Sequence, residues 1–363
     1  MRVLLILLIG VHGIIHLLGF LKGFQILKTE SVELSVSKPM AVFWLLTALL
    51  FAVTSIAFFF KKDSWIFLGI IAVICSQILI FLHWQDAQWG TLANIVLFIC
   101  LLFAFSNWLL EKKWAFEKKQ FQDSLYIHNT PTLLPEDVSH LPVVVQHWMK
   151  RSGVVGKPRT LGLRLQQSGE MKTKPSSRWM PFTAEQYFNS QPPAFHWTAE
   201  VSMGLGLFLK GRDAFKEGEG EMMILLGALF PVVNEKNTPQ MNSGAMIRYL
   251  AEICWFPSAA ASPYIVWEAR DPFSAKASFT QNGMTVSGIF RFSEKGDLES
   301  FEAERYFGGG LKAEKHLWVV TISDYLEQEG IRVPKQCSVM WKLPEGDFEW
   351  LRFSISKLEY NPI

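Results

Sequence analysis

The sequence has few charges in its first third, few cysteines anywhere, and none of the common enzyme motifs. Of its 35 basic and 33 acidic residues, 68 in all, only 10 lie in residues 1–110. The other 58 divide into 29 basic and 29 acidic residues, so the composition gives no basic face for nucleic acid. Phosphate loops, dinucleotide fingerprints, GxSxG and HExxH are absent. The four cysteines lack zinc-ligand spacing and are interpreted as buried free thiols: Cys75, Cys100, Cys254 and Cys337. We therefore expect no catalytic set, no metal site, no cofactor and no nucleic-acid partner.

What the first third does contain is long uncharged runs. A helix needs about 20 apolar residues to cross the hydrocarbon core of a bilayer. Four runs reach this length, and we predict four transmembrane helices in residues 1–110: Val3–Leu21, Met40–Phe60, Ser64–Gln85 and Ala87–Leu110. The first run lacks the small-residue cleavage pattern of a signal peptide, so we expect it to be retained.

The basic residues of the short loops predict an orientation in the cell membrane. Seven Lys and Arg residues fall on one side, at positions 2, 61, 62, 112, 113, 118 and 119, and three on the other, at positions 22, 28 and 38. Because basic loops stay in the cytoplasm, this count places both termini, and the C-terminal domain, on the cytoplasmic side.

Two histidines lie within the first apolar run, in the stretch HGIIHLLGF. On a helix, His12, His16, Gly19 and Gly23 fall within a sector of roughly 60°. Gly19 and Gly23 form a GxxxG step that lets another helix approach closely. We expect the histidines to join an intramembrane polar cluster with Gln77 and Asn94, and Thr47, Thr54 and Thr91 are further candidate partners. Structural hydrogen bonding, a proton or small-ligand role, and metal or haem ligation remain open as interpretations.

The second part of the chain is predicted to be an antiparallel β domain. We interpret residues 111–158 as an amphipathic junction and linker helix, and residues 159–363 as consecutive strands with short links. Asn282-Gly283 is a strong hairpin signal. Residues 241–255 have a helical period, with Asn242 or Ser243 as cap and an Arg248–Glu252 pair. The predicted fold class is α+β: a four-helix transmembrane block followed by a curved antiparallel meander that is covered by a helix.

Aromatic residues gather on the strand faces of the β domain. Their simplest interpretation is core packing; the alternative is a curved sheet that lines an apolar cleft. We predict the ligand face of such a cleft at Trp179, Phe195, Trp197, Phe290 and Trp318. Glu302 and Glu304 share a strand face, as a pair of acids for catalysis would, but salt bridging to residues such as Arg291 and Arg305, or exposure to water, is the preferred interpretation.

Three segments carry a family resemblance: RWMPFTAEQYFNSQPPAFHWTAEV, SGIFRFSEKGDLESFEAERY and SDYLEQEGIRVP. Together with HGIIHLLGF, they resemble a bacterial membrane-protein family that joins an N-terminal helix block to a β-rich domain of unknown function. KPSSRWMPF, PPAFHWTAEV and SDYLEQEGIRVP are also similar to segments of LolA-like lipoprotein carriers. That second resemblance implies a curved antiparallel sheet over helices, with an apolar cavity for acyl chains.

These observations favour a non-enzymatic membrane protein whose β domain binds or shields an apolar, lipid-like ligand next to the bilayer. Its expected partners are membrane lipids and an apolar small molecule, and its oligomeric state is left open. The alternatives are a membrane enzyme acting on a lipid or quinone, and a structural or interaction module.

Overall fold

The computed structural model describes residues 2–26, 36–123, 130–310 and 313–362. It divides into two compact units, Met1–Lys113 and Trp114–Ile363. Six of the residues in the predicted junction and linker, 124–129, lie outside the described residues.

The first unit is helical. Its elements are α1 (Arg2–Gly23), α2 (Lys38–Phe59), α3 (Ser64–Leu82), the short α4 (Trp84–Ala87), and the start of α5 (Gly90–Asp123). Among the described residues, α1, α2, α3 and α5 are long and apolar enough to cross a membrane. Many of their large apolar side chains are exposed, among them Leu4, Phe43 and Phe81. The four apolar helices predicted from the sequence are therefore present, and α5 extends beyond its predicted end at Leu110.

Glycines let α1 approach α2 closely. A Cβ added at Gly19 would lie 2.5 Å from the Trp44 ring, and one at Gly23 would lie 2.4 Å from the Ala41 Cβ. Gly13 faces Phe51 in the same way, at 2.7 Å. Only glycine fits at such distances, so both glycines of the GxxxG step are helix-contact residues in the structure.

The second unit begins with the last ten residues of α5, followed by α6 (Pro135–Val138) and α7 (Val143–Arg151). The first six strands are β1 (Gly162–Met171), β2 (Met180–Ser190), β3 (Pro193–Gly204), β4 (Leu207–Lys216), β5 (Glu219–Leu226) and β6 (Phe230–Lys236). The other seven are β7 (Ile265–Asp271), β8 (Ser274–Gln281), β9 (Met284–Phe292), β10 (Leu298–Phe307), β11 (Glu314–Gln328), β12 (Ile331–Leu343) and β13 (Gly346–Tyr360).

These strands form a 13-stranded sheet in which every neighbouring pair is antiparallel, in the order β6-β5-β4-β3-β2-β1-β13-β12-β11-β10-β9-β8-β7. The predicted curved meander is confirmed, with one addition: β1 pairs with β13, so the first and last strands meet in the middle of the sheet. The hairpin at Asn282-Gly283 joins β8 to β9, and both residues have the positive φ that a tight two-residue turn needs.

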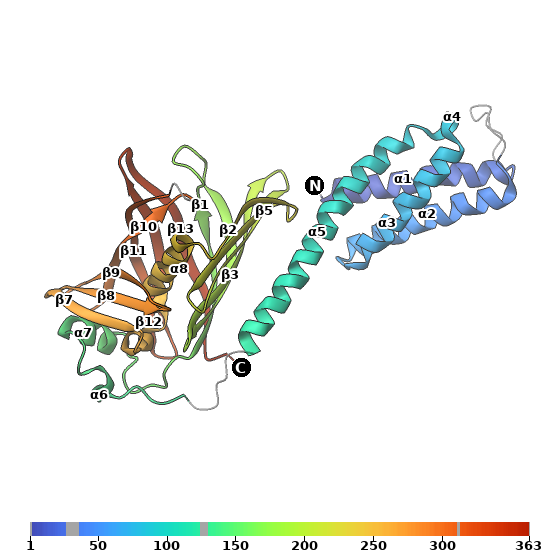
Figure 1. The fold of residues 1–363 in the computed structure, drawn as a ribbon. Coiled ribbons are helices and arrows are strands. Elements are labelled where there is room, and N and C mark those ends of the chain that lie inside the picture. The colour runs from blue at the N-terminus through green and yellow to red at the C-terminus, as the bar shows by residue number, and fades with distance from the viewer. Residues whose placement is uncertain (1, 27–35, 124–129, 311–312, 363) are drawn as a thin grey trace. The chain divides into compact units, whose positions relative to one another are not determined.

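The chain crosses from one sheet edge, β6, to the other, β7, through α8 (Pro239–Glu252), η1 (Ile253–Trp255) and η2 (Pro257–Ala261). The sheet curls around α8 (Figure 1). The helix starts two residues earlier than predicted, because Thr238 rather than Asn242 or Ser243 is the cap: its hydroxyl accepts from the Met241 amide at 3.1 Å. Pro239 then occupies the first turn, where a missing N–H costs no hydrogen bond.

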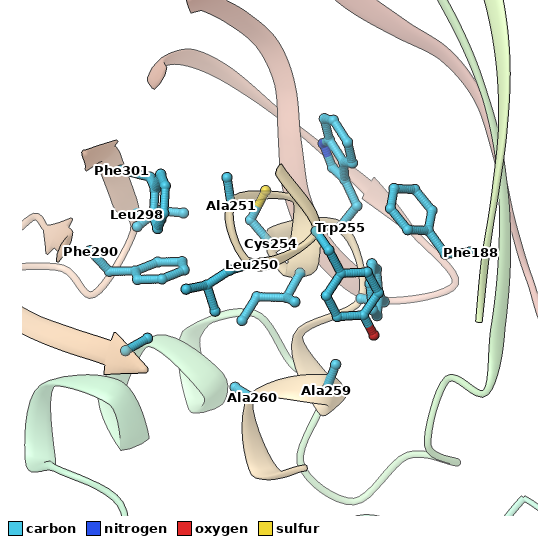
Figure 2. Packing of buried hydrophobic residues seen from close by; sticks show 14 of the residues in the cluster. Phe188, Leu250, Ala251, Cys254, Trp255, Ala259, Ala260, Phe290, Leu298 and Phe301 are labelled. Atoms are coloured by element: carbon cyan, nitrogen blue, oxygen red, sulfur yellow. The ribbon is translucent and has the colours of Figure 1, made fainter. Parts of the chain in front are cut away.

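The core of this unit lies between α8 and the inner face of the sheet. In Figure 2, Leu250, Ala251, Cys254 and Trp255 from α8 and η1 project between sheet residues that surround them, Phe188, Phe290, Leu298 and Phe301. Phe188, Phe290 and Phe301 are 1% exposed or less. The apolar stripe predicted for the 241–255 helix is therefore buried by both halves of the sheet.

The end of α5 packs on the outer face of the sheet. Lys118 Nζ donates to Glu185 on β2 at 2.8 Å, and Arg212 Nη1 on β4 donates to Glu117 at 3.0 Å. His196 Nε2 on β3 lies 3.5 Å from the same Glu117 carboxylate. The segment predicted as an amphipathic junction is thus fixed within the second unit by ion pairs to β2 and β4 and by the His196 contact to β3.

Candidate apolar ligand cavity

A cavity of about 470 Å³ lies between the inner face of the sheet and α8. Both halves of the sheet and the helix contribute to its wall, which includes Trp197, Met222, Ala245, Trp318, Trp341 and Phe353. Its volume falls within the range of about 300–1,000 Å³ that is typical of sites for small molecules.

The alternation of each strand makes this wall apolar. On β11, Val320 and Ile322 line the cavity, whereas Thr321 between them is exposed on the other face. On β3, Trp197 lines the cavity and its indole N–H donates to Gln167 at 2.9 Å. The period of two that predicted the strands therefore also predicts which side chains face the cavity.

The five aromatic residues of the predicted ligand face occupy three environments. Trp197 and Trp318 line the cavity. Phe195 and Phe290 are buried in the core beside it, 1% and 0% exposed. Trp179 is outside the cavity wall: it precedes β2 and lies under the Lys172 ammonium and the Arg352 guanidinium, at 4.7 and 4.6 Å from the ring centroid. Trp341 and Trp350 line the cavity although the sequence analysis did not select them.

A buried ion network lies at one part of the cavity wall. The Arg248 guanidinium on α8 donates to Asp213 at 2.6 Å, to Glu252 at 2.9 Å and to Gln186 at 3.2 Å. Gln186 donates in turn to the second Glu252 oxygen at 2.7 Å. The predicted Arg248–Glu252 pair is confirmed, and Asp213 is an unpredicted third member. Burial raises the pKa of the Glu252 carboxyl, although the charge of Arg248 opposes the shift.

A second arginine on the cavity wall, Arg305 of β10, has no such partners. Its guanidinium lies over the Trp318 ring at 4.8 Å and the Trp341 ring at 5.9 Å. Its Nε atom is buried without a hydrogen-bond partner, and no carboxylate of the described residues forms an ion pair with it. Burial lowers the pKa of Arg305 to about 10, so the side chain stays charged at neutral pH.

The structure corrects the sequence interpretation of Arg305. Glu302 and Glu304 were expected to form salt bridges to residues such as Arg291 and Arg305 or to face water. Glu302 pairs with Arg291 at 2.6 Å and Glu304 is exposed, but neither carboxylate pairs with Arg305. The reason is parity: Glu302 and Glu304 face outward, whereas Arg305 shares the inner face with Phe301 and Ala303. Counting in twos from Phe301 would have revealed a charged residue on an apolar face.

The polar residues of the helical unit form one hydrogen-bonded cluster. His12 Nε2 lies 2.9 Å from Asn94 Oδ1, and Asn94 Nδ2 donates to Gln77 Oε1 at 3.0 Å. Ser76 Oγ lies at the centre, 2.9 Å from His16 Nε2, 3.3 Å from His12 Nε2 and 3.0 Å from Asn94 Nδ2. The structure thus brings all four predicted residues together and adds Ser76, which the sequence analysis missed because a lone serine gives little signal in an apolar run.

Of the three threonines proposed as further partners, one joins the polar cluster and two do not. Thr91 accepts from Gln77 at 3.2 Å. Thr47 and Thr54 instead donate to carbonyls of their own helix, at Phe43 and Leu50, so they do not reach the histidines. Bonding one turn back satisfies a hydroxyl in an apolar helix without any neighbour.

Two cysteines of the β unit also line the cavity. Cys254 and Cys337 are buried free thiols, and burial raises the pKa of Cys337 to about 12. Within the part of the chain that the structure describes, no group of three or more His, Cys, Asp or Glu residues is placed to hold a metal ion. These thiols are protonated at neutral pH and behave as apolar wall residues.

Comparison with known proteins gives a match to a family model and a similarity to solved structures. A LolA superfamily protein from Nitrosomonas europaea, known from its crystal structure, is similar to this chain with a TM-score of 0.33 and 8% sequence identity; the match covers 61% of this chain and 96% of that one. The chain has no match among curated proteins. A profile described as a family of unknown function, DUF6544, matches residues 131–353. The resemblance of the strand segments to a domain of unknown function is thereby confirmed. Since the match extends from the residues before α6 into β13 and covers more than half of the sequence, the chain belongs to the DUF6544 family.

Proposed function

We propose that the β unit binds a lipid-like ligand in the cavity between α8 and the sheet. The observation that carries this proposal is the cavity itself, about 470 Å³ in volume and lined mainly by aromatic and aliphatic side chains. Protein interiors are normally packed too densely to leave a void of this size. Apolar ligands favour such a site because their burial removes apolar surface from water.

The four apolar helices support a location for this binding. They would anchor the β unit at the membrane, where lipids are the abundant apolar molecules. From the seven basic loop residues on one side against three on the other, we propose that the β unit is cytoplasmic. A reporter fused to the C-terminus tests the side: cytoplasmic activity supports the orientation, and activity on the opposite side overturns it.

Two neighbouring positions on β11 offer a matched test of the cavity. Val320→Trp adds an indole inside the cavity, whereas Thr321→Trp adds the same group on the exposed outer face. The full-length protein is purified in amphipol, and bound lipid is quantified by mass spectrometry of an organic extract. Wild type and Thr321→Trp should carry the same lipid, and Val320→Trp should carry severalfold less at an unchanged melting temperature.

Equal lipid in the two variants would show that the lipid is held elsewhere, for example around the helices. A folded wild-type protein that neither retains lipid nor takes up added fatty acid would refute the proposal.

A further inference from the structure

The chemistry of the cavity wall specifies one end of the ligand. Arg305 is a cation on an otherwise apolar strand face, and it has no ion pair or hydrogen bond within the described residues. Arg305 is half-buried, and its Nε atom is buried without a partner, so the guanidinium has lost part of its hydration and gained no compensating bond. Charged groups held in such surroundings are often found in ligand sites, where the ligand supplies the missing partner.

Neighbouring carboxylates do not supply that partner. Asp213 and Glu252 act on Arg305 only at long range, and both are bound by Arg248, at 2.6 and 2.9 Å. The guanidinium of Arg305 lies between the Trp318 ring, at 4.8 Å, and the backbone of α8, where a Cβ on Gly244 would be 3.5 Å from Nε. The aromatic ring fixes the plane of the guanidinium and leaves its donors for an acceptor outside the chain.

Two more unpartnered donors lie on the same wall. The indole N–H groups of Trp318 and Trp350 are buried without hydrogen-bond partners. One unpartnered acceptor, Asp213 Oδ1, belongs to the Arg248 network. At Arg305 and the Trp318 ring beneath it, therefore, the buried unsatisfied groups are donors, which fits a ligand with oxygen acceptors and negative charge.

We propose that the ligand is an anionic amphiphile whose acyl chain fills the cavity and whose oxyanion headgroup, a carboxylate or a phosphate, is bound by Arg305. This inference rests on the proposed lipid-binding function and adds the charge of the headgroup. The guanidinium forms charge-assisted hydrogen bonds with either oxyanion, and low local polarity strengthens them.

Three single-chain lipids test the headgroup: palmitate carries a carboxylate, lysophosphatidate a phosphate, and monopalmitoylglycerol no charge. Binding of each radiolabelled lipid is measured on the full-length protein in amphipol. Arg305→Gln removes the charge and keeps a polar side chain of similar length. Arg291→Gln removes the same charge from the outer face of the same sheet, where Arg291 pairs with Glu302.

Arg305→Gln should weaken binding of the preferred anionic lipid by about 10- to 100-fold, the usual contribution of a charge-assisted bond. Binding of monopalmitoylglycerol should change by less than about twofold, and Arg291→Gln should match wild type for all three lipids. Arg305→Lys, which keeps the charge without the bidentate geometry, should lie between wild type and Arg305→Gln. The anionic lipid that wild type prefers identifies the headgroup as carboxylate or phosphate.

The outcomes separate the two proposals. If Arg305→Gln binds all three lipids as tightly as wild type does, the headgroup assignment is wrong while the cavity proposal stands. If wild type binds none of the three, the lipid-binding function itself fails. A merely structural role for Arg305 is checked without ligand: the melting temperature of Arg305→Gln should fall by no more than a few degrees, because the variant loses the stacking on Trp318 and Trp341 but no ion pair or hydrogen bond.

Discussion

Replacing Arg248 with methionine should strongly destabilise the β unit. Arg248 bridges two carboxylates, and the side chains of Asp213, Glu252 and Arg248 are 4%, 12% and 15% exposed. The variant keeps a long apolar stem but leaves both carboxylates buried without their cation. Removing one partner of a buried ion pair costs about 3–5 kcal/mol. For a unit of this size, such a loss corresponds to a fall in melting temperature of roughly 6–20 °C.

The assay is thermal unfolding of the full-length protein in detergent, followed by near-UV circular dichroism of the tryptophans. A triple variant adds Asp213→Asn and Glu252→Gln to Arg248→Met and so removes the two unpaired negative charges. It should recover more than half of the fall in melting temperature. A melting temperature of Arg248→Met within about 2 °C of wild type would contradict this prediction, because two buried carboxylates without their cation should cost more unfolding free energy than that shift represents.

The same variant has a predicted pH dependence. Burial raises the pKa of Glu252 in the folded protein, and loss of the Arg248 charge should raise it further. A carboxyl whose folded pKa lies above its unfolded value of about 4.3 binds protons more readily when folded, so its contribution to stability falls as pH rises from that value to the folded pKa. Arg248→Met should therefore recover part of its lost stability between pH 7.5 and pH 5, relative to wild type. A stability difference that does not change over this interval would contradict the assignment.

Two further predictions concern the helices. Asn94→Leu removes the residue that bonds His12, Ser76 and Gln77, and it should lower the unfolding free energy of the helical unit in detergent by about 1 kcal/mol. Thr47→Val loses only a bond within its own helix and should lower this free energy by less. Equal losses in the two variants would show that the polar cluster adds nothing to stability. Burial opposes ionisation of the Glu117 and Glu185 carboxyls on the outer face, but hydrogen bonds from the neighbouring basic side chains outweigh it and lower both pKa values. The stability that a lowered pKa provides is present above the unfolded value of about 4.3 and is lost as pH falls through the folded pKa. Amide exchange of residues 114–123, corrected for intrinsic rates, should therefore accelerate on acidification below pH 4. Unchanged protection of these amides would contradict the prediction.

Local patterns were sufficient to predict most of the fold. Uncharged runs of membrane length predicted α1, α2, α3 and α5, and the period-two alternation with Gly-containing turns predicted an antiparallel sheet. The pairing of β1 with β13 was not predictable in this way, because it joins residues almost 200 positions apart. Alternation specifies the face of a strand but not its partner, and only the turns between consecutive strands carry information about neighbours.

The candidate site was predictable only in part, for the same reason. The sequence indicated aromatic strand faces, and two of the five selected residues, Trp197 and Trp318, line the cavity. It could not separate these from Phe195 and Phe290, which also point to the inner face of the sheet but are fully packed in the core. Whether a wall residue faces a void or a neighbour depends on the curvature of the whole sheet, to which all thirteen strands contribute.

Arg248 and Arg305, both on the cavity wall, are expected to differ in role: the first contributes to stability and the second to binding. Arg248 and Arg305 both lie over aromatic rings, at 4.9 Å from Trp197 and 4.8 Å from Trp318. Arg248 is matched by two carboxylates of the chain, so its removal should destabilise the protein whether or not a ligand is bound. Arg305 has no such match within the described residues, so its removal should weaken ligand binding and cost the unliganded fold only its stacking on Trp318 and Trp341. A purely structural role for both would predict parallel losses of stability, and a binding role for both would predict parallel losses of affinity. Opposite responses require that the partner missing at Arg305 comes from outside the chain.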